Sequence, residues 1–263
     1  MLKIKLNLID NPKFKNYNSN LKLYLQKENV ILDNFDFFIL IAHIETKKDI
    51  EIFKEYKNDK IGKIAILHNE FEKAFEILHY VDRIIVHHKF QKDILLRMFI
   101  DSTLIIHIDY PIDYKKFLNP PNSIKIYIPD DANDYEIVSF LLDNYEVVNE
   151  PYNSSIIVMA YRDEHFGNYH KFYELFGYSR VFLMPKFPQF IEFAILKATP
   201  EILYSDTKSL KIIIEKLKDK WFYNYYLSIS RAYAISNNFR RFSKQLLNVI
   251  RNVIPEDFLS LYI

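Results

Sequence analysis

The sequence contains no cysteine and only three glycines among its 263 residues. The absence of cysteine excludes disulfides, thiolate nucleophiles and cysteine-ligated metals. The scarcity of glycine excludes a glycine-rich phosphate loop, because such loops need left-handed turns and a close approach of the backbone to the phosphate. Neither sign of charge is in large excess, since the net charge is +1. A chain without a global field is not expected to bind nucleic acid.

Long apolar runs are absent as well. The longest, 37–42, is far shorter than the roughly 20 residues that a membrane-spanning helix needs. The first residues, MLKIKLNLIDN, lack the apolar core of a signal peptide. We therefore predict a cytoplasmic protein. The abundant residues include Ile, Lys, Asn, Tyr and Phe, which AT-rich codons can encode, and we hypothesise that the source is an archaeon or an archaeal virus.

What the chain does contain is a repeated alternation of strand-like and helix-like segments in its first half. The expected strands are 4–9, 37–43, 63–67, 83–86 and 104–108, and the expected helices are 20–27, 46–56, 70–80 and 89–99. Thr46 is the expected cap of the second of these helices. Such βα alternation predicts an α/β fold with a parallel sheet covered by helices.

A second alternation follows the Asn-Pro-Pro-Asn sequence at 119–122, where consecutive prolines break both helix and interior strand. Its expected strands are 124–128, 155–160, 181–184 and 201–204, and its expected helices are 133–142, 169–176, 188–198 and 209–217. Two more helices, 221–234 and 238–253, are expected in the tail. We predict an N-terminal domain at 1–118, a second domain at 119–220, and C-terminal helices at 221–263 that pack back on the domains.

The expected βαβ unit at 181–204 indicates where a ligand would bind. In open α/β sheets, ligands lie beyond the carboxyl ends of the strands. The polar side chains expected there are Lys186, Gln189 and Glu192. Arg162 follows the strand expected at 155–160 and should open onto the same edge.

Six segments resemble, in their order along the chain, those of the retaining GT-B glycosyltransferases. They are KIAILHN (63–69), VDRIIVHHKFQKDILL (81–96), HIDYPIDYKKF (107–117), HKFYELFGYSRVFLMP (170–185), KATPEILYSD (197–206) and RAYAISNNFRRFSKQLLNVI (231–250). The resemblance implies two Rossmann-like domains with parallel sheets facing a cleft. It also implies a hexosyltransferase that moves a sugar from a nucleotide-sugar donor to an acceptor without a metal or another cofactor.

The resemblance implies an acceptor side in the first domain. His68 stands at the end of the strand at 63–67, where it could orient the acceptor hydroxyl or take its proton. His43 is the second candidate, and Asn69 and Glu70 are the neighbours expected on the acceptor side. A structural alternative stays open, in which His68 is a loop residue that caps the helix beginning near Glu70.

The donor side is implied in the second domain. The leaving diphosphate gains negative charge as the glycosidic bond breaks, so cationic groups and a helix N-terminus should stabilise it. Arg162 and Lys186 are the expected cations, and Gln189 and Glu192 complete the expected donor-binding set.

Two departures from the family pattern favour an alternative. Family members carry two glutamates eight positions apart, whereas Met184 stands eight positions before Glu192. Asp130 and Asp131 stand near the place where the family has cations, and their charge would repel a diphosphate. The alternative is a catalytically inactive binding or scaffold protein with the GT-B-like frame.

Other conspicuous residues have ordinary interpretations. His87 and His88 would point to opposite sides of a strand, so we interpret both as structural and expect no metal site. The basic residues of the tail, such as Arg240, Arg241 and Lys244, are typical of the solvated face of an amphipathic helix. A more specific interpretation is that these residues make a peripheral contact with anionic lipid or form a homodimer surface.

Overall fold

A computed structural model describes residues 4–57, 59–68, 71–114, 119–162, 169–187, 190–191 and 199–255 of the chain. The residues form two compact units, Met1–Pro111 with Phe239–Ile263 (unit 1) and Ile112–Asn238 (unit 2). The contacts thus divide the chain at Ile112 and Phe239, whereas the domain prediction uses 119 and 221. The chain enters unit 2 before the prolines because the Ile112 amide donates to the Asn237 carbonyl at 2.7 Å.

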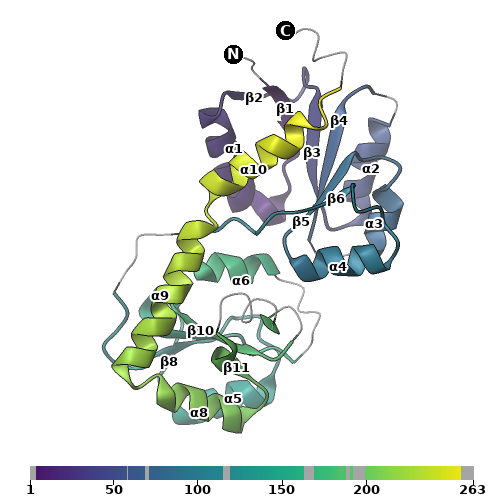
Figure 1. Cartoon of the computed structure of the whole chain (residues 1–263). Helices are drawn as coiled ribbons and strands as arrows, with labels where there is room; N and C mark the ends of the chain where they lie inside the picture. The colour runs from purple at the N-terminus through teal and green to yellow at the C-terminus, as the bar shows by residue number, and fades with distance from the viewer. Residues whose placement is uncertain are drawn as a thin grey trace. The chain divides into compact units, whose positions relative to one another are not determined.

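Unit 1 is built on a six-stranded, fully parallel sheet with the order β2-β1-β3-β4-β5-β6 (Figure 1). Its strands are β1 Ile4–Leu8, β2 Val30–Leu32, β3 Ile39–Ile44, β4 Gly62–Leu67, β5 Arg83–Val86 and β6 Ile105–His107. Every residue of β3 and β4 is buried, as expected for strands covered on both faces. The five strands predicted here are confirmed, and β2 is an additional edge strand.

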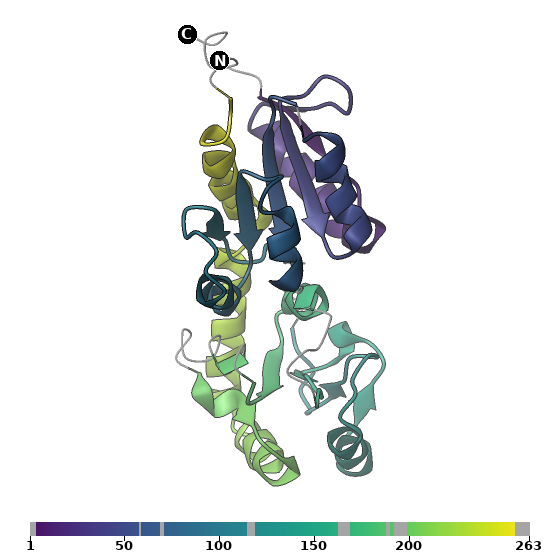
Figure 2. The same ribbon diagram turned by 90° about the vertical axis from the view of Figure 1, so that its right-hand side faces the viewer.

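Helices cover both faces of this sheet (Figures 1 and 2). They are α1 Lys15–Lys27, α2 Lys47–Glu55, α3 Phe71–Ile77, α4 Lys89–Arg97 and α10 Phe239–Arg251, and a short 3-10 helix, Pro12–Phe14, precedes α1. The core between the sheet and α2, α3 and α4 includes Leu40, Ala42, Phe53, Ile77 and Leu95. On the other face α1 and α10 pack on each other. Thr46 caps α2, as predicted.

The segment after α10 runs closely over the start of β4. A Cβ added at Gly62 would lie 2.4 Å from the carbonyl oxygen of Val253. Glycine is therefore needed at this position for steric reasons. This approach shows that the C-terminal part of the chain belongs structurally to unit 1.

Unit 2 contains a five-stranded parallel sheet with the order β11-β10-β9-β7-β8. Its strands are β7 Ile126–Tyr127, β8 Val147–Val148, β9 Ile156–Val158, β10 Val181–Pro185 and β11 Leu203–Tyr204, and its helices are α5 Tyr135–Asn144, α6 Tyr169–Phe176, α8 Thr207–Lys216 and α9 Lys220–Ser236. Short 3-10 helices lie at Pro151–Asn153 and Pro200–Ile202. The strands of the predicted βαβ unit, β10 and β11, do pair in parallel. Most of the helix expected at 188–198 lies outside the described residues.

The two tail helices belong to different units. α9 packs against β10 and α6 of unit 2, whereas α10 packs against α1 of unit 1. The apolar side chains of α10, including Phe242, Leu246 and Ile250, are buried, and Arg240, Arg241 and Lys244 are exposed. This arrangement agrees with the solvated-face interpretation of the basic tail. In the described parts of the chain, no helix is both long enough and apolar enough to span a bilayer.

Candidate functional site

A pocket lies at the carboxyl edge of the unit 1 sheet, where the strand order reverses. β2 and β3 pair with opposite sides of β1, and such a switch point is the usual ligand crevice of an open α/β sheet. The pocket has a volume of about 260 Å³. Its lining comes from the segment that follows β1, from the end of β3 and from the first turns of α2: Ile9, Asp10, Asn11, Pro12, His43, Glu45, Thr46, Lys48, Asp49 and Ile52.

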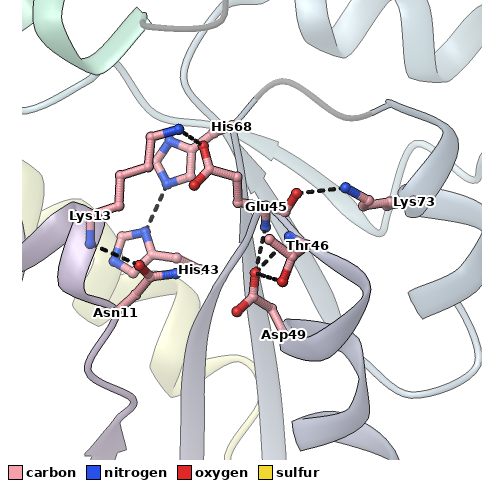
Figure 3. Close-up of polar contacts among 8 residues, drawn as sticks. All are labelled: Asn11, Lys13, His43, Glu45, Thr46, Asp49, His68 and Lys73. Atoms are coloured by element: carbon pink, nitrogen blue, oxygen red, sulfur yellow. Dashed lines mark hydrogen bonds and ion pairs between the residues drawn. The ribbon is translucent and has the colours of Figure 1, made fainter.

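A lysine and backbone amides engage two of the carboxylates that line this pocket, Glu45 and Asp49 (Figure 3). The Glu45 carboxylate pairs with Lys13 Nζ, and Lys73 Nζ donates to the Glu45 carbonyl at 2.5 Å. Asp49 Oδ2 accepts hydrogen bonds from the Glu45 and Thr46 amides at 3.0 and 2.7 Å, closing the first turn of α2. A pocket with this balance of charge suits a neutral polar ligand better than a highly charged one.

Three histidines line one face of the sheet beside this pocket. In the parallel register His43 pairs with Ile66, and Ile66 pairs with Ile85. His68 and His87 each stand two positions further along their strands, so side-chain alternation puts all three on the same face. The ring centroids of His43 and His68 are 5.0 Å apart, and those of His68 and His87 are 5.5 Å apart.

A chain of hydrogen bonds fixes the tautomers of His43 and His68. Asn18 Nδ2 donates to the Ile9 carbonyl at 3.2 Å, so Asn18 Oδ1 is the atom that accepts from His43 Nε2 at 2.8 Å. A neutral His43 then has a lone pair on Nδ1, which lies 2.8 Å from His68 Nε2. A neutral His68 therefore donates through Nε2 to His43 Nδ1.

Aromatic rings hold these two imidazoles in place. Phe14 stacks on both, with centroid distances of 4.6 Å to His43 and 4.0 Å to His68. The edge of Tyr17 meets His43 at 4.8 Å. His43 is 2% exposed and His68 is 5% exposed, so neither ring can turn freely.

Burial keeps the neighbouring histidines neutral. Burial, followed by repulsion from His87, lowers the pKa of His43 to about 3. Burial lowers the pKa of His87 to about 4, although the hydrogen bond to the Ile108 carbonyl acts in the opposite sense. The pKa of His88 falls to about 3, again mainly through burial. Gln91 Oε1 accepts hydrogen bonds from the backbone amides of His87 and His88, each at 3.0 Å.

Tyr17 and His87 carry buried polar atoms that have no hydrogen-bond partner among the described residues. These are the Tyr17 hydroxyl and His87 Nε2, and the two ring centroids lie 6.0 Å apart. His87 Nδ1 donates to the Ile108 carbonyl at 2.9 Å, which leaves a lone pair on Nε2. Burial also raises the pKa of the Tyr17 hydroxyl well above its usual value, so the hydroxyl stays neutral.

We predict that Tyr17→Phe leaves the stability of unit 1 unchanged or raises it by about 1 kcal/mol, because the change removes a buried hydroxyl without a partner. Urea unfolding followed by circular dichroism measures this difference. Tyr204→Phe, in unit 2, is the comparison, because the buried Tyr204 hydroxyl donates to the Met159 carbonyl at 2.8 Å and its loss should lower stability. A clear loss of stability in Tyr17→Phe would contradict the prediction and would indicate a water that bridges Tyr17 and His87.

The corresponding edge of unit 2 carries the predicted cations. Arg162 follows β9 and Lys186 follows β10, and these two strands are neighbours in the sheet with Val158 paired to Leu183. Both side chains are exposed. The Arg162 amide donates to Asn133 Oδ1 at 2.8 Å, and the Lys186 amide donates to the Tyr204 carbonyl at 3.0 Å. The backbone around both cations is therefore fixed at the carboxyl ends of adjacent strands.

Carboxylates lie at the same edge of unit 2. Asp131 Oδ1 accepts a hydrogen bond from the Tyr161 hydroxyl at 2.7 Å. Burial, followed by the charges of Asp130 and Asp131, raises the pKa of Tyr127 to about 12. Asp130 and Asp131, in the segment after β7, thus place negative charge at the edge that carries Arg162 and Lys186.

The structure brings together His43 and His68 of the predicted acceptor side, whereas Asn69, Glu70, Gln189 and Glu192 lie outside the described residues. The roles predicted for all these residues stay predictions.

Sequence reasoning missed Asn18, although a signal was present. Phe14, Asn18, Leu21 and Leu25 form one buried helical stripe, and a polar residue in such a stripe needs a buried partner. No group of three or more His, Asp or Glu side chains is arranged to hold a metal in the parts of the chain that the structure describes.

Comparison with known proteins identifies solved structures that share this fold. No family model matches the sequence, and no curated protein matches it. Among solved structures, Anabaena HepE in complex with UDP and glucose is similar with a TM-score of 0.68 and 9% identity, over 95% of this chain and 100% of that one. A trehalose-6-phosphate synthase is similar with a TM-score of 0.57 and 9% identity, over 94% of this chain and 81% of that one.

A third structure extends the range of activities found on this fold. UDP-GlcNAc 2-epimerase from Neisseria meningitidis, bound to UDP-GlcNAc, is similar with a TM-score of 0.51 and 10% identity, over 95% of this chain and 100% of that one. The likeness therefore concerns the fold rather than one reaction. With its two parallel sheets, of six and five strands, and the helices that follow them, the chain is an α/β protein with a GT-B-like fold, structurally similar to the GT-B glycosyltransferases at low sequence identity.

Proposed function

We propose that the protein is a glycosyltransferase that moves a hexosyl group from a nucleotide-sugar donor to a hydroxyl of an acceptor. The observation that carries the proposal is the hydrogen-bonded chain from Asn18 through His43 to His68. The chain orients the ring of His68, which in this proposal takes the proton of an acceptor hydroxyl.

The electrostatics of the pocket in unit 1 support an acceptor of a particular kind. Glu45 pairs with Lys13, and Asp10 pairs with Lys22 at 2.6 Å. Paired charges leave hydrogen-bonding groups without a strong net field, which suits a sugar or another polyhydroxyl compound. The acceptor in this proposal is therefore a neutral polyol.

Arg162 and Lys186 are the donor-side residues of the proposal. Charge develops on the diphosphate in the transition state, and cations aimed at it lower the barrier. Gln189 and Glu192 belong to the same proposed donor site, and the sugar transfer needs no metal in this scheme. The structures of HepE contain UDP with glucose or UDP-glucose, which makes a uridine diphosphate sugar the first donor to test.

We predict that one family of nucleotide sugars raises the midpoint of thermal unfolding, because a ligand that binds the folded state stabilises it by mass action. At a concentration 100-fold above Kd the gain is about 2.7 kcal/mol. The panel consists of UDP-, GDP- and ADP-sugars with the free nucleotides. Lys186→Ala should abolish the shift, whereas Lys211→Ala, which removes an exposed lysine of α8 in the same unit, should keep it.

The acidic residues at the edge of unit 2 favour a second candidate, a GT-B-like binding or scaffold protein without activity. Asp130 and Asp131 act on Tyr127 at this edge, and the same charges oppose a diphosphate. If no nucleotide or nucleotide sugar shifts the midpoint at millimolar concentration, the second candidate replaces the first.

A further inference from the structure

Three aromatic side chains are exposed at the start of α9. Trp221 is 67% exposed, Phe222 38% and Tyr225 41%. The ring of Trp221 lies 5.1 Å from that of Phe222 and is stacked on that of Tyr225 at 5.7 Å. α9 buries its other face through Tyr226, Leu227 and residues further along the helix. Contiguous exposed rings of this size are typical of a docking surface.

Exposed lysines lie close to these rings along the chain. Lys208, Lys211, Ile212 and Lys216 are exposed on α8 with the spacing of one helical face, and α8 leads directly into α9 (Figure 1). Lys218 and Lys220 lie in and just after the connecting turn. We name the exposed residues Lys211, Ile212, Lys216, Lys220, Trp221 and Tyr225 the α8–α9 corner.

The two acidic residues of this segment are already engaged. Glu215 pairs with Lys218 at 2.7 Å. Asp219 caps α9, since its Oδ1 accepts from the Trp221 amide at 2.8 Å and from the Phe222 amide at 3.3 Å. With five lysines and two carboxylates, residues 207–225 nevertheless carry a net charge of +3.

We propose that the α8–α9 corner docks the protein on an anionic membrane surface. Trp and Tyr rings partition to the interface between lipid and water. Each lysine near an anionic surface contributes attraction, and its aliphatic stem lies along the apolar region while the ammonium group stays with the headgroups. Rings and lysines together supply the two signals that reversible membrane attachment needs.

The charges of the α8–α9 corner favour a membrane over a second copy of the chain or a nucleic acid as its partner. In a symmetric dimer through the corner, the lysines of one copy would face those of the other, which is repulsive. For nucleic acid, arginine is the preferred cation, and residues 207–225 contain five lysines and no arginine. The α10 helix is a poorer lipid-binding element, because its apolar face is buried within unit 1.

Trp221 allows the proposal to be tested on the unaltered protein, since the chain has a single tryptophan. With vesicles that contain phosphatidylglycerol, the emission of Trp221 should shift to the blue, and brominated lipid should quench it. Pure phosphatidylcholine vesicles should produce neither change. Co-sedimentation with anionic vesicles without a change in Trp221 emission would overturn the proposal, because another surface would then bind the lipid.

Charge-reversal variants provide the matched control. Lys211→Glu with Lys216→Glu should weaken binding to anionic vesicles by at least about tenfold. Arg240→Glu with Lys244→Glu changes the charge by the same amount on the exposed face of α10 and should leave binding unchanged. The proposal is overturned if the α10 variant loses binding while the α8 variant keeps it, or if the unaltered protein does not bind anionic vesicles. It is also overturned if the corner mediates concentration-dependent dimerisation, or if the protein binds single-stranded nucleic acid in place of vesicles. Vesicle binding is measured without nucleotide sugar, so its outcome is independent of the proposed glycosyltransferase activity.

Discussion

Acidification is expected to unfold unit 1 as the pH falls from about 6.5 towards 4. Burial lowers the folded-state pKa values of His43, His87 and His88 from 6.5 to about 3, 4 and 3. Between these limits the unfolded chain binds protons that the folded chain does not. The stabilisation is therefore complete above pH 6.5 and is lost as the pH falls through this window, at a rate of about 4 kcal/mol per pH unit for three histidines.

Urea unfolding at a series of pH values, followed by far-UV circular dichroism, measures this loss. His87→Phe removes one of the three groups and should reduce the slope by about a third. His79→Ala, which removes an exposed histidine from the turn after α3, is the control for loss of a histidine from the surface of unit 1. Carboxylates have an ordinary pKa near 3.8, so a loss of stability that begins only below pH 4 would contradict the assignment to histidines.

His68→Ala is expected to lower the rate of sugar transfer by about 10²- to 10⁴-fold, the usual contribution of a general base. The proposed reason is that His68 accepts the proton of the acceptor hydroxyl. Nucleotide binding should persist, because the proposed donor residues, Arg162 and Lys186, belong to unit 2. The measurement is kcat with the donor identified by the thermal panel, together with the nucleotide-dependent midpoint shift.

Asn18→Leu tests the orientation of His68 rather than its chemistry. The change removes the oxygen that accepts from His43 Nε2, so His43 no longer has a fixed tautomer. We expect a loss of about tenfold and a displaced pH profile of kcat, with His79→Ala as the control that changes neither. Full activity in His68→Ala with retained donor binding would contradict the general-base role while leaving the transferase proposal open.

Much of the fold follows from local sequence patterns. The strand Arg83–Val86 and the helix Tyr169–Phe176 lie where their apolar patterns predict them. Thr46 begins α2 because its segment supplies both halves of a capping box, Thr46 and Asp49. Patterns of this kind are read from neighbouring residues, and the repeated βα alternation is enough to predict two parallel sheets.

The short edge strands could not be predicted in this way. β2 has three residues and β8 has two, and segments of this length carry no recognisable period. They are strands because each pairs in parallel with a longer or more central neighbour, β1 or β7. Their place in the sheet is thus a tertiary property.

By itself the sequence determined the α/β class, the order of the helices and of the strands other than β2 and β8, and the positions of His43 and His68 near strand ends. Tertiary structure decided which residues meet. The row of His43, His68 and His87 depends on the register of three strands, and Asn18 joins it from a helix that packs on the same face. The return of α10 to unit 1 likewise depends on burial against α1. Contacts between distant segments are fixed by packing and by the pairing of buried polar groups, and local propensity does not encode them.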